Sequence, residues 1–226
     1  MTGVIPIEDA SRRPGSDPVI TIGLIAINVI VFVVELIQGQ SFVLRWAATA
    51  ADISAGHRLW TLLTAMFLHA SWSHIVGNMV FFWVFGPGVE DAMGPVKYLL
   101  FYLAGGVVAF LAQVLVTPSS TIPMLGASGA IAAVMGAFLV MYPRHQIKSA
   151  VFFGFWWNLT YIPAAVLIGV WFLLQLVSIG TVGQQEGSTS GGGVAYVAHV
   201  AGMAFGALTA LIFGGGERSE RKGEAS

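Results

Sequence analysis

Cysteine is absent from the 226 residues, and charged side chains are scarce, at 9% of the chain. The absence of cysteine excludes disulfides, thiolate metal sites and a cysteine nucleophile. A soluble globular domain has about 25% charged residues, so this chain lacks the polar surface that water would require. The net charge is −1, which provides no basic surface and excludes nucleic acid as an expected partner. Lipid is therefore the expected solvent for most of the molecule.

Long hydrophobic runs take the place of the missing charge. A membrane-spanning helix needs about 20 mostly apolar residues, and six segments meet or approach this length: 19–37, 75–89, 98–116, 127–141, 150–179 and 194–213. The sequence therefore predicts an all-α membrane protein, a bundle of six transmembrane helices over residues 19–213. Residues 1–18 form a polar N-terminal segment, and residues 214–226 form a polar tail that we expect to be disordered.

Lys and Arg are distributed unevenly between the two sides of this bundle. Of the ten, only Arg45 and Arg58 lie on the side opposite the termini. Because positive charge collects on the cytoplasmic side of membrane proteins, we expect both termini in the cytoplasm and residues 38–73 outside. The apolar stretch and tryptophans of that segment predict a first outer loop that is partly inserted. No transit peptide precedes the first run, so a bacterial plasma membrane is the expected location.

The fourth predicted span, 127–141, is too short for a bilayer. Its 15 residues make about 22 Å of helix, against a hydrocarbon core of about 30 Å. The preceding loop, 117–126, must then dip into the bilayer, where irregular backbone is tolerated only inside protein or along a watery cavity. The sequence therefore predicts that Ser128, at the start of this helix, faces a water-accessible pocket.

Ser128 lies among small residues, Gly126-Ala-Ser128-Gly129-Ala. One interpretation is a surface that allows two helices to approach closely. The other is a nucleophile elbow, but an elbow needs a strand and a soluble sheet around it. The small residues Ser128, Ala132 and Gly136 form a ladder along one face of the predicted helix.

His199 lies inside the sixth predicted span, where histidine is rare. Its ordinary interpretation is a hydrogen bond between helices. Gly202 and Gly206 share its helix face and allow a close helix contact. Two ladders of small residues, one with a serine and the other with a histidine, are what a close Ser–His contact between spans requires.

His74 and Asn78 are four residues apart at the start of the second span and therefore share a helix face. Two hydrogen-bond donors in that arrangement can bind an oxyanion, although a helix-packing pair is the ordinary interpretation. No metal site is expected, because no acidic residue has the spacing to join the histidines. Glu90, at the other end of the span, is interpreted as a structural hydrogen-bonding residue.

Three motifs together resemble the rhomboid intramembrane serine proteases. They are His74-Ile-Val-Gly-Asn78, Gly126-Ala-Ser128-Gly129 and Ala198-His199-Val-Ala-Gly202, and Gly86-Pro-Gly-Val-Glu90 resembles a fourth element of that family. Each motif is weak alone, but their order on the second, fourth and sixth spans agrees with the family. The resemblance covers residues 19–215.

The resemblance implies a Ser–His dyad without a catalytic aspartate. Ser128 would be the nucleophile, His199 the general base, and His74, Asn78 and the Ser128 backbone N–H the oxyanion hole. Gly126, Gly129, Gly202, Gly206 and Glu90 would support this site. The implied activity is cleavage of transmembrane protein substrates in lipid, without a cofactor or metal. The oligomeric state is left open.

Two departures from the family stand out. Many members have Tyr four residues after the serine, packed on the catalytic histidine, where this chain has Ala132. Many also have Trp-Arg in the first outer loop, where this chain has Trp60-Thr61. A catalytically inactive relative that binds membrane proteins, or a small transporter, remains the alternative function.

Overall fold

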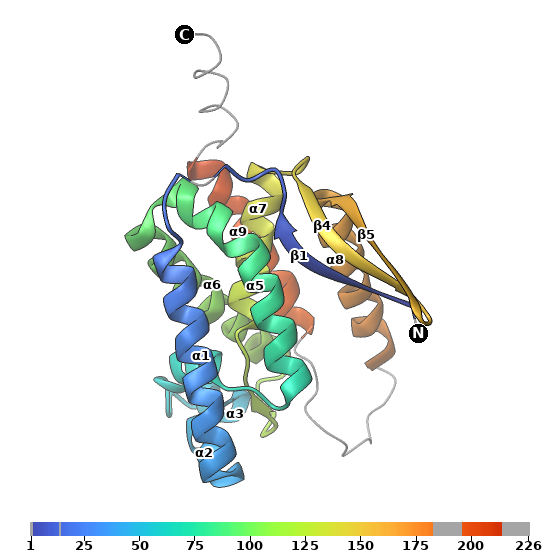
Figure 1. The fold of residues 1–226 in the computed structure, drawn as a ribbon. Helices are drawn as coiled ribbons and strands as arrows, with labels where there is room; N and C mark the ends of the chain where they lie inside the picture. Colours follow the sequence, from blue (N-terminus) through green and yellow to red (C-terminus); the bar gives the residue numbers. More distant parts are fainter. Residues whose placement is uncertain (1, 14, 183–195, 214–226) are drawn as a thin grey trace.

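The computed structural model describes residues 2–13, 15–182 and 196–213 (Figure 1). Its helices are α1 (Val19–Gln38), α2 (Gln40–Trp46), α3 (Ala50–Ser54), α4 (Thr61–Thr64), the 3₁₀ turn η1 (Ala65–Phe67), α5 (Trp72–Met93), α6 (Pro95–Val116), α7 (Ser128–Met141), α8 (Ala164–Val182) and α9 (Tyr196–Phe213). Its strands are β1 (Thr2–Asp9), β2 (Ala48–Thr49), β3 (Pro123–Met124), β4 (Gln146–Phe153) and β5 (Trp156–Pro163). The predicted tail 214–226 lies outside the described residues, as does most of the segment between the fifth and sixth predicted spans.

A helical bundle forms the body of the molecule, as predicted. By length and composition, α1 and α6 are long and apolar enough to cross a membrane. Helix α7 has only 14 residues and lies in the middle of the bundle, packed against α5, α6 and α9 (Figure 1). Most of its side chains are buried, so this span, predicted to be too short for a bilayer, is enclosed by the other helices.

Local signals fix both ends of α5, the helix that carries His74 and Asn78. Ser71 caps its first turn, because the Ser71 hydroxyl accepts the His74 backbone N–H at 3.2 Å. Gly94 ends the helix in a left-handed conformation, with φ 76°, and Pro95 starts α6 at once. Within α5, buried Glu90 accepts the backbone N–H groups of Ile20 and Thr21, both at 2.9 Å. Glu90 thereby ties the start of α1 to α5.

The predicted fifth span is wrong in its first half. Residues 150–163 belong to an antiparallel hairpin of β4 and β5, and α8 begins only at Ala164. Phe153 pairs with Trp156, which leaves a two-residue turn whose first residue, Gly154, has φ 62°. Hydropathy could not reveal this, because aromatic and β-branched residues are apolar but favour strands. The all-α prediction is therefore wrong for this segment.

The N-terminal segment supplies the third strand of this sheet, whose order is β1-β4-β5. Strand β1 pairs antiparallel with β4, from Thr2 opposite Phe153 to Asp9 opposite Ile147, with a shift in register after Pro6. The sheet packs against α5 through β1 and against α8 through β5. From the sequence, residues 1–18 were predicted only to be a polar segment, and no strand was predicted there.

The segment between α1 and α5 holds the loop that precedes Ser128. Strand β2 pairs with β3, with Ala48 opposite Met124. The Arg58 guanidinium orders the segment, because it donates to the carbonyl oxygens of Leu44 and Ala47 and forms a 3.0 Å ion pair with Asp52. Partial insertion of this segment into the bilayer stays a prediction.

Candidate active site

The turn before α7 presents Ser128 to a cavity. Gly126 has φ 123°, a conformation that favours glycine, and its backbone N–H donates to the Ala65 carbonyl at 2.8 Å. A Cβ at Gly126 would lie 2.9 Å from two atoms of the His74 imidazole. The glycine therefore permits both the turn and the close approach of His74. Ser128 follows as the first residue of α7.

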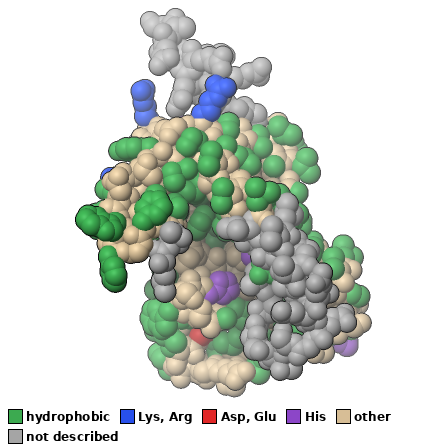
Figure 2. Space-filling model, turned by 90° about the vertical axis from the view of Figure 1, so that its right-hand side faces the viewer, with side chains coloured by type: hydrophobic (Ala, Val, Ile, Leu, Met, Phe, Trp, Pro, Cys, Tyr) green, Lys and Arg blue, Asp and Glu red, His purple; other side chains and the backbone are tan. Residues whose placement is uncertain are grey.

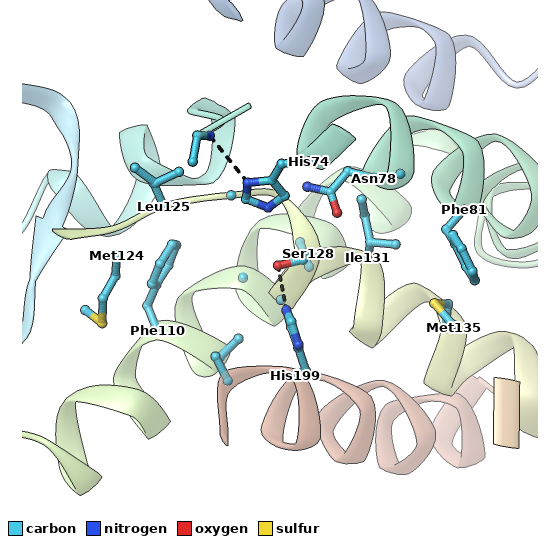
Figure 3. Close-up of a pocket in the computed structure, with 18 of the residues that line it drawn as sticks. His74, Asn78, Phe81, Phe110, Met124, Leu125, Ser128, Ile131, Met135 and His199 are labelled. Carbon is cyan, nitrogen blue, oxygen red and sulfur yellow. Dashed lines mark hydrogen bonds between the residues drawn. The ribbon is translucent and has the colours of Figure 1, made fainter. Parts of the chain in front are cut away.

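Ser128 and His199 are in direct contact. The Ser128 Oγ lies 2.7 Å from the His199 Nε2, and the His199 side chain is buried on α9. Both residues line a cavity of about 510 Å³ between α5, α6, α7, α8 and α9 (Figure 3). Figure 2 shows a hollow with a histidine side chain at its floor on the face that carries the sheet.

Backbone packing of α7 on α9 sets this contact. A Cβ at Gly202 would overlap the carbonyl oxygen of Gly129, and a Cβ at Gly206 would overlap that of Ala133. A Cβ at Gly136 would overlap the Met203 carbonyl oxygen. The closest approach on α7 thus runs through Gly129, Ala133 and Gly136. Gly136 belongs to the predicted ladder, whereas Gly129 and Ala133 each follow a ladder residue by one position. We call these facing residues of α7 and α9 the seam.

His74 stands on the opposite side of Ser128 from His199 (Figure 3). Its Nδ1 accepts the Ala70 backbone N–H at 3.4 Å. In a neutral imidazole the other nitrogen then carries the proton, so Nε2–H is the donor on the side of Gly126. The structure thus brings His74, Ser128 and His199 to one cavity.

Asn78 is buried one helical turn after His74 and lines the same cavity. Its Nδ2 lies 3.0 Å from the Nε2 of His69. An amide nitrogen is a donor, so the His69 Nε2 accepts this hydrogen bond. All four predicted side-chain members of the site, Ser128, His199, His74 and Asn78, therefore meet here.

The sequence analysis missed His69 and Glu35 as supports of Asn78. The Glu35 carboxylate, buried on α1, accepts the His69 backbone N–H at 3.1 and 3.2 Å. His69 in turn positions Asn78 through the hydrogen bond to its side-chain amide. The signal was present, because an acidic residue inside an apolar span needs a buried partner, but the partner is a backbone group that no sequence motif marks. Within the described residues, no cluster of three or more His, Asp or Glu side chains is placed to hold a metal ion.

The family follows from a comparison with known proteins. The model of the Rhomboid domain matches residues 56–216, which include every predicted site residue. The chain belongs to the rhomboid family. It is therefore an integral membrane protein with a helical bundle, in a family of intramembrane serine proteases.

Three relatives illustrate the breadth of the rhomboid family. RHOMBOID-like protein 12, mitochondrial, of Arabidopsis thaliana is 31% identical over 81% of this chain and 57% of its own length. Rhomboid protease GluP of Bacillus subtilis is 32% identical over 58% of this chain and 26% of its own length. The Rhomboid protease GlpG homolog of Cronobacter sakazakii is 24% identical over 89% of this chain and 65% of its own length. This chain therefore spans between a quarter and two thirds of these relatives.

One aromatic side chain of this rhomboid lies against the candidate base. Trp171, on α8, has its ring centroid 5.5 Å from that of His199 and also lines the cavity. The Trp171 ring also lies 6.4 Å, centroid to centroid, from that of Phe81 on α5. Ala132, where many members have Tyr, is fully buried. The sequence analysis did not single out Trp171, because a tryptophan in an apolar run has no polar or spacing signal.

Proposed function

We propose that this chain is an intramembrane serine endopeptidase that cuts transmembrane protein substrates. The observation that carries the proposal is the 2.7 Å contact between Ser128 Oγ and His199 Nε2 at the wall of a cavity. A serine hydroxyl becomes a good nucleophile when a base takes its proton, and imidazole suits that task at neutral pH. His199 accepts the proton of Ser128 and later returns it to the leaving amine, and water then hydrolyses the acyl-enzyme.

Three donors are proposed for the oxyanion that forms on the attacked carbonyl. They are His74 Nε2–H, an Asn78 Nδ2–H and the Ser128 backbone N–H, and both side chains line the cavity beside Ser128. Donors of this kind typically contribute about 2.7–4 kcal/mol each to the transition state. The Ser128 N–H also lies at the N-terminus of α7, where the helix dipole favours negative charge.

Trp171 is proposed as the positioning residue for His199. An imidazole base must keep one ring orientation to reach the serine proton, and here the aromatic side chain packed on it comes from α8. This contact takes the place of the Tyr that many family members have at the position of Ala132. The geometry of the dyad then depends on α8 as well as on the seam.

The substrate is proposed to be a helix that unwinds locally at the cavity. A peptide bond inside a transmembrane helix has its N–H and C=O in internal hydrogen bonds. Attack on its carbonyl requires that these bonds open first. Segments with Gly, Pro or other weak helix formers near the cut are therefore preferred.

The proposed topology has six spans, α1, α5, α6, α7, α8 and α9, with both termini in the cytoplasm of a bacterium. The Lys and Arg asymmetry supports the orientation, and two of the three relatives above are bacterial. Because the chain has no Cys, single cysteines report topology cleanly. Arg13→Cys should resist an impermeant thiol reagent in intact cells, and Ser41→Cys, on the predicted outer side, should react. The opposite pattern would invert the topology.

The dyad is tested with the purified protein in lipid and a panel of single-span substrates. Ser128→Ala and His199→Ala should each abolish cleavage, and the double variant should be no worse than either, because the two groups act as a unit. A serine-directed phosphonate should label Ser128 in the unmodified chain and label His199→Ala far more slowly. Wild-type cleavage by Ser128→Ala contradicts the proposal, and an unreactive Ser128 in the unmodified chain identifies an inactive member of the family.

A further inference from the structure

The sheet changes from charged to aromatic along its strands. On its outward side, Lys148 pairs across the sheet with Glu8, at 2.9 Å, and with Tyr161. The hydrogen bond and charge of Glu8 raise the pKa of Lys148, so this row stays charged. The next row on that side joins Ile5, Ala150 and Leu159. The last row pairs Phe152 with Trp157. Polarity thus falls steadily towards the hairpin turn.

The turn end exposes apolar rings in every direction. We call residues 152–157 the β4–β5 tip. Phe155, in the turn, is fully exposed, and Trp156 is 82% exposed. Trp156 and Trp157 are consecutive in one strand, so their rings point to opposite faces of the sheet, and both rings are exposed in the described part of the chain. Figure 2 shows hydrophobic side chains gathered over this part of the molecule.

We propose that the β4–β5 tip inserts into the bilayer, at the boundary between headgroups and acyl chains. An exposed cluster of this kind marks a surface that is covered in the working protein, and tryptophan prefers the membrane interface. The leaflet is the one near the start of α1 and the end of α9, where the base of the sheet lies (Figure 1).

Continuity with the lipid-facing bundle identifies lipid as the occupant. Strand β5 runs directly into α8 at Ala164, and Val166, Val170 and Leu173 of that helix are exposed apolar side chains. A spanning helix of an integral membrane protein turns such residues to lipid, so the tip extends an apolar surface that already faces the bilayer.

The depth is limited by the polar groups of the same strands. Strand β5 is an edge of the sheet, so half of its backbone N–H and C=O groups have no strand partner. Exposed Asn158 lies next to Trp157. Such groups are not tolerated in the hydrocarbon core but remain hydrated at the headgroups. The tip is therefore a shallow anchor and not a seventh span.

The experiment uses the full chain in phosphatidylcholine–phosphatidylglycerol vesicles, with an environment-sensitive fluorophore on a single introduced cysteine. Phe155→Cys reports the tip, and Glu8→Cys, at the charged end of the same sheet, is the matched control. At the tip we expect a blue-shifted emission, loss of quenching by aqueous iodide, and strong quenching by lipids with a nitroxide near the headgroup. The control should show quenching by iodide and little by the lipids.

Two results overturn the proposal. Equal iodide quenching at both positions places the tip in water. If neither iodide nor the nitroxide lipids quench the fluorophore at the tip, protein covers the tip. If that protection changes with the protein-to-lipid ratio, the covering protein is a second copy of this chain. If Phe155→Cys fails to fold by circular dichroism, the same measurements on Trp156→Cys decide. The quenching of intrinsic tryptophan fluorescence by brominated lipids should also be smaller in the double variant Trp156→Phe/Trp157→Phe. Unchanged quenching in that variant would contradict insertion.

Discussion

The seam and the sheet hold the molecule together in opposite ways. In the seam, Gly202 and Gly206 bring the backbone of α9 against carbonyl groups of α7, so at these two positions no side chain separates the helices. In the sheet, large side chains such as Phe155 and Trp157 are exposed, and the strands are held together by their backbone pairing. The seam has no room for change and fixes the Ser128–His199 distance. The sheet has room for change and lies outside the cavity. Substitutions in the seam should therefore strongly affect both folding and chemistry, whereas substitutions of exposed sheet side chains should affect stability little and chemistry not at all.

The largest effect is expected from Gly206→Ala. The added methyl would overlap the Ala133 carbonyl, so the helices must separate, and overpacking of this kind costs about 1–3 kcal/mol. Gly23→Ala is the control, because a Cβ there meets nothing within 4 Å, and it should be neutral or slightly stabilising. Thermal unfolding in detergent measures both. Equal melting temperatures for the two variants would show that the seam tolerates change, and would break the comparison.

The second-largest effect is expected at the contact between Trp171 on α8 and His199. Trp171→Ala should lower kcat by about 10-fold to 100-fold with little change in KM, because a small displacement of a catalytic group costs about that much. Trp171→Phe should retain most of the activity. Phe81→Ala is the control, since it removes another ring beside Trp171 and leaves the Trp171 ring on His199.

The opposite result for Trp171 has a clear meaning. If Trp171→Ala and Phe81→Ala both speed cleavage, the two rings obstruct the gap between α5 and α8, and Trp171 does not position His199. The rate at which the phosphonate labels Ser128 distinguishes positioning of His199 from obstruction of the substrate, because the small phosphonate does not need a wide entrance. It should fall in Trp171→Ala and stay unchanged in Phe81→Ala.

The smallest effect is expected from the charged row of the sheet. Lys148 and Glu8 are partly exposed, at 32% and 53% of their side chains, and water and salt weaken the attraction in such pairs. Glu8→Gln and Lys148→Gln should leave cleavage unchanged and lower the melting temperature slightly. High salt should remove even that difference. A loss of activity in either variant would show that the sheet acts on the cavity, and would contradict the division drawn above.

The same contrast explains what could be predicted from the sequence. Ser128, His199 and the seam glycines belong to short motifs whose helical spacing determines which residues share a face, so the site could be assembled on paper. The hairpin could not be, since residues 150–163 are apolar enough for a helix and hydropathy does not measure conformation. The pairing of β1 with β4 could not be predicted from the sequence for another reason. It joins residue 2 to residue 153, and no local pattern encodes that contact.

His69 and Trp171 show the limit within the site itself. Each supports a predicted residue from a different element, through a contact of 3.0 Å with Asn78 for His69 and a ring contact with His199 for Trp171. A motif identifies groups that act on the substrate. The groups that hold them depend on how the helices pack, which the sequence does not state.

The long reach of β1 also sets an order of assembly. Among the described residues its strand partner is β4, so β1 must wait for this pairing while α1, α5, α6 and α7 are made. Until β4 appears, the edge groups of β1 have no sheet to join, and closing so long a loop is slow. Strand β1 can therefore pair only after α1, α5, α6 and α7 have been made, while α8 and α9 are still to follow. A chain arrested before residue 146 would contain Ser128 but not this closure.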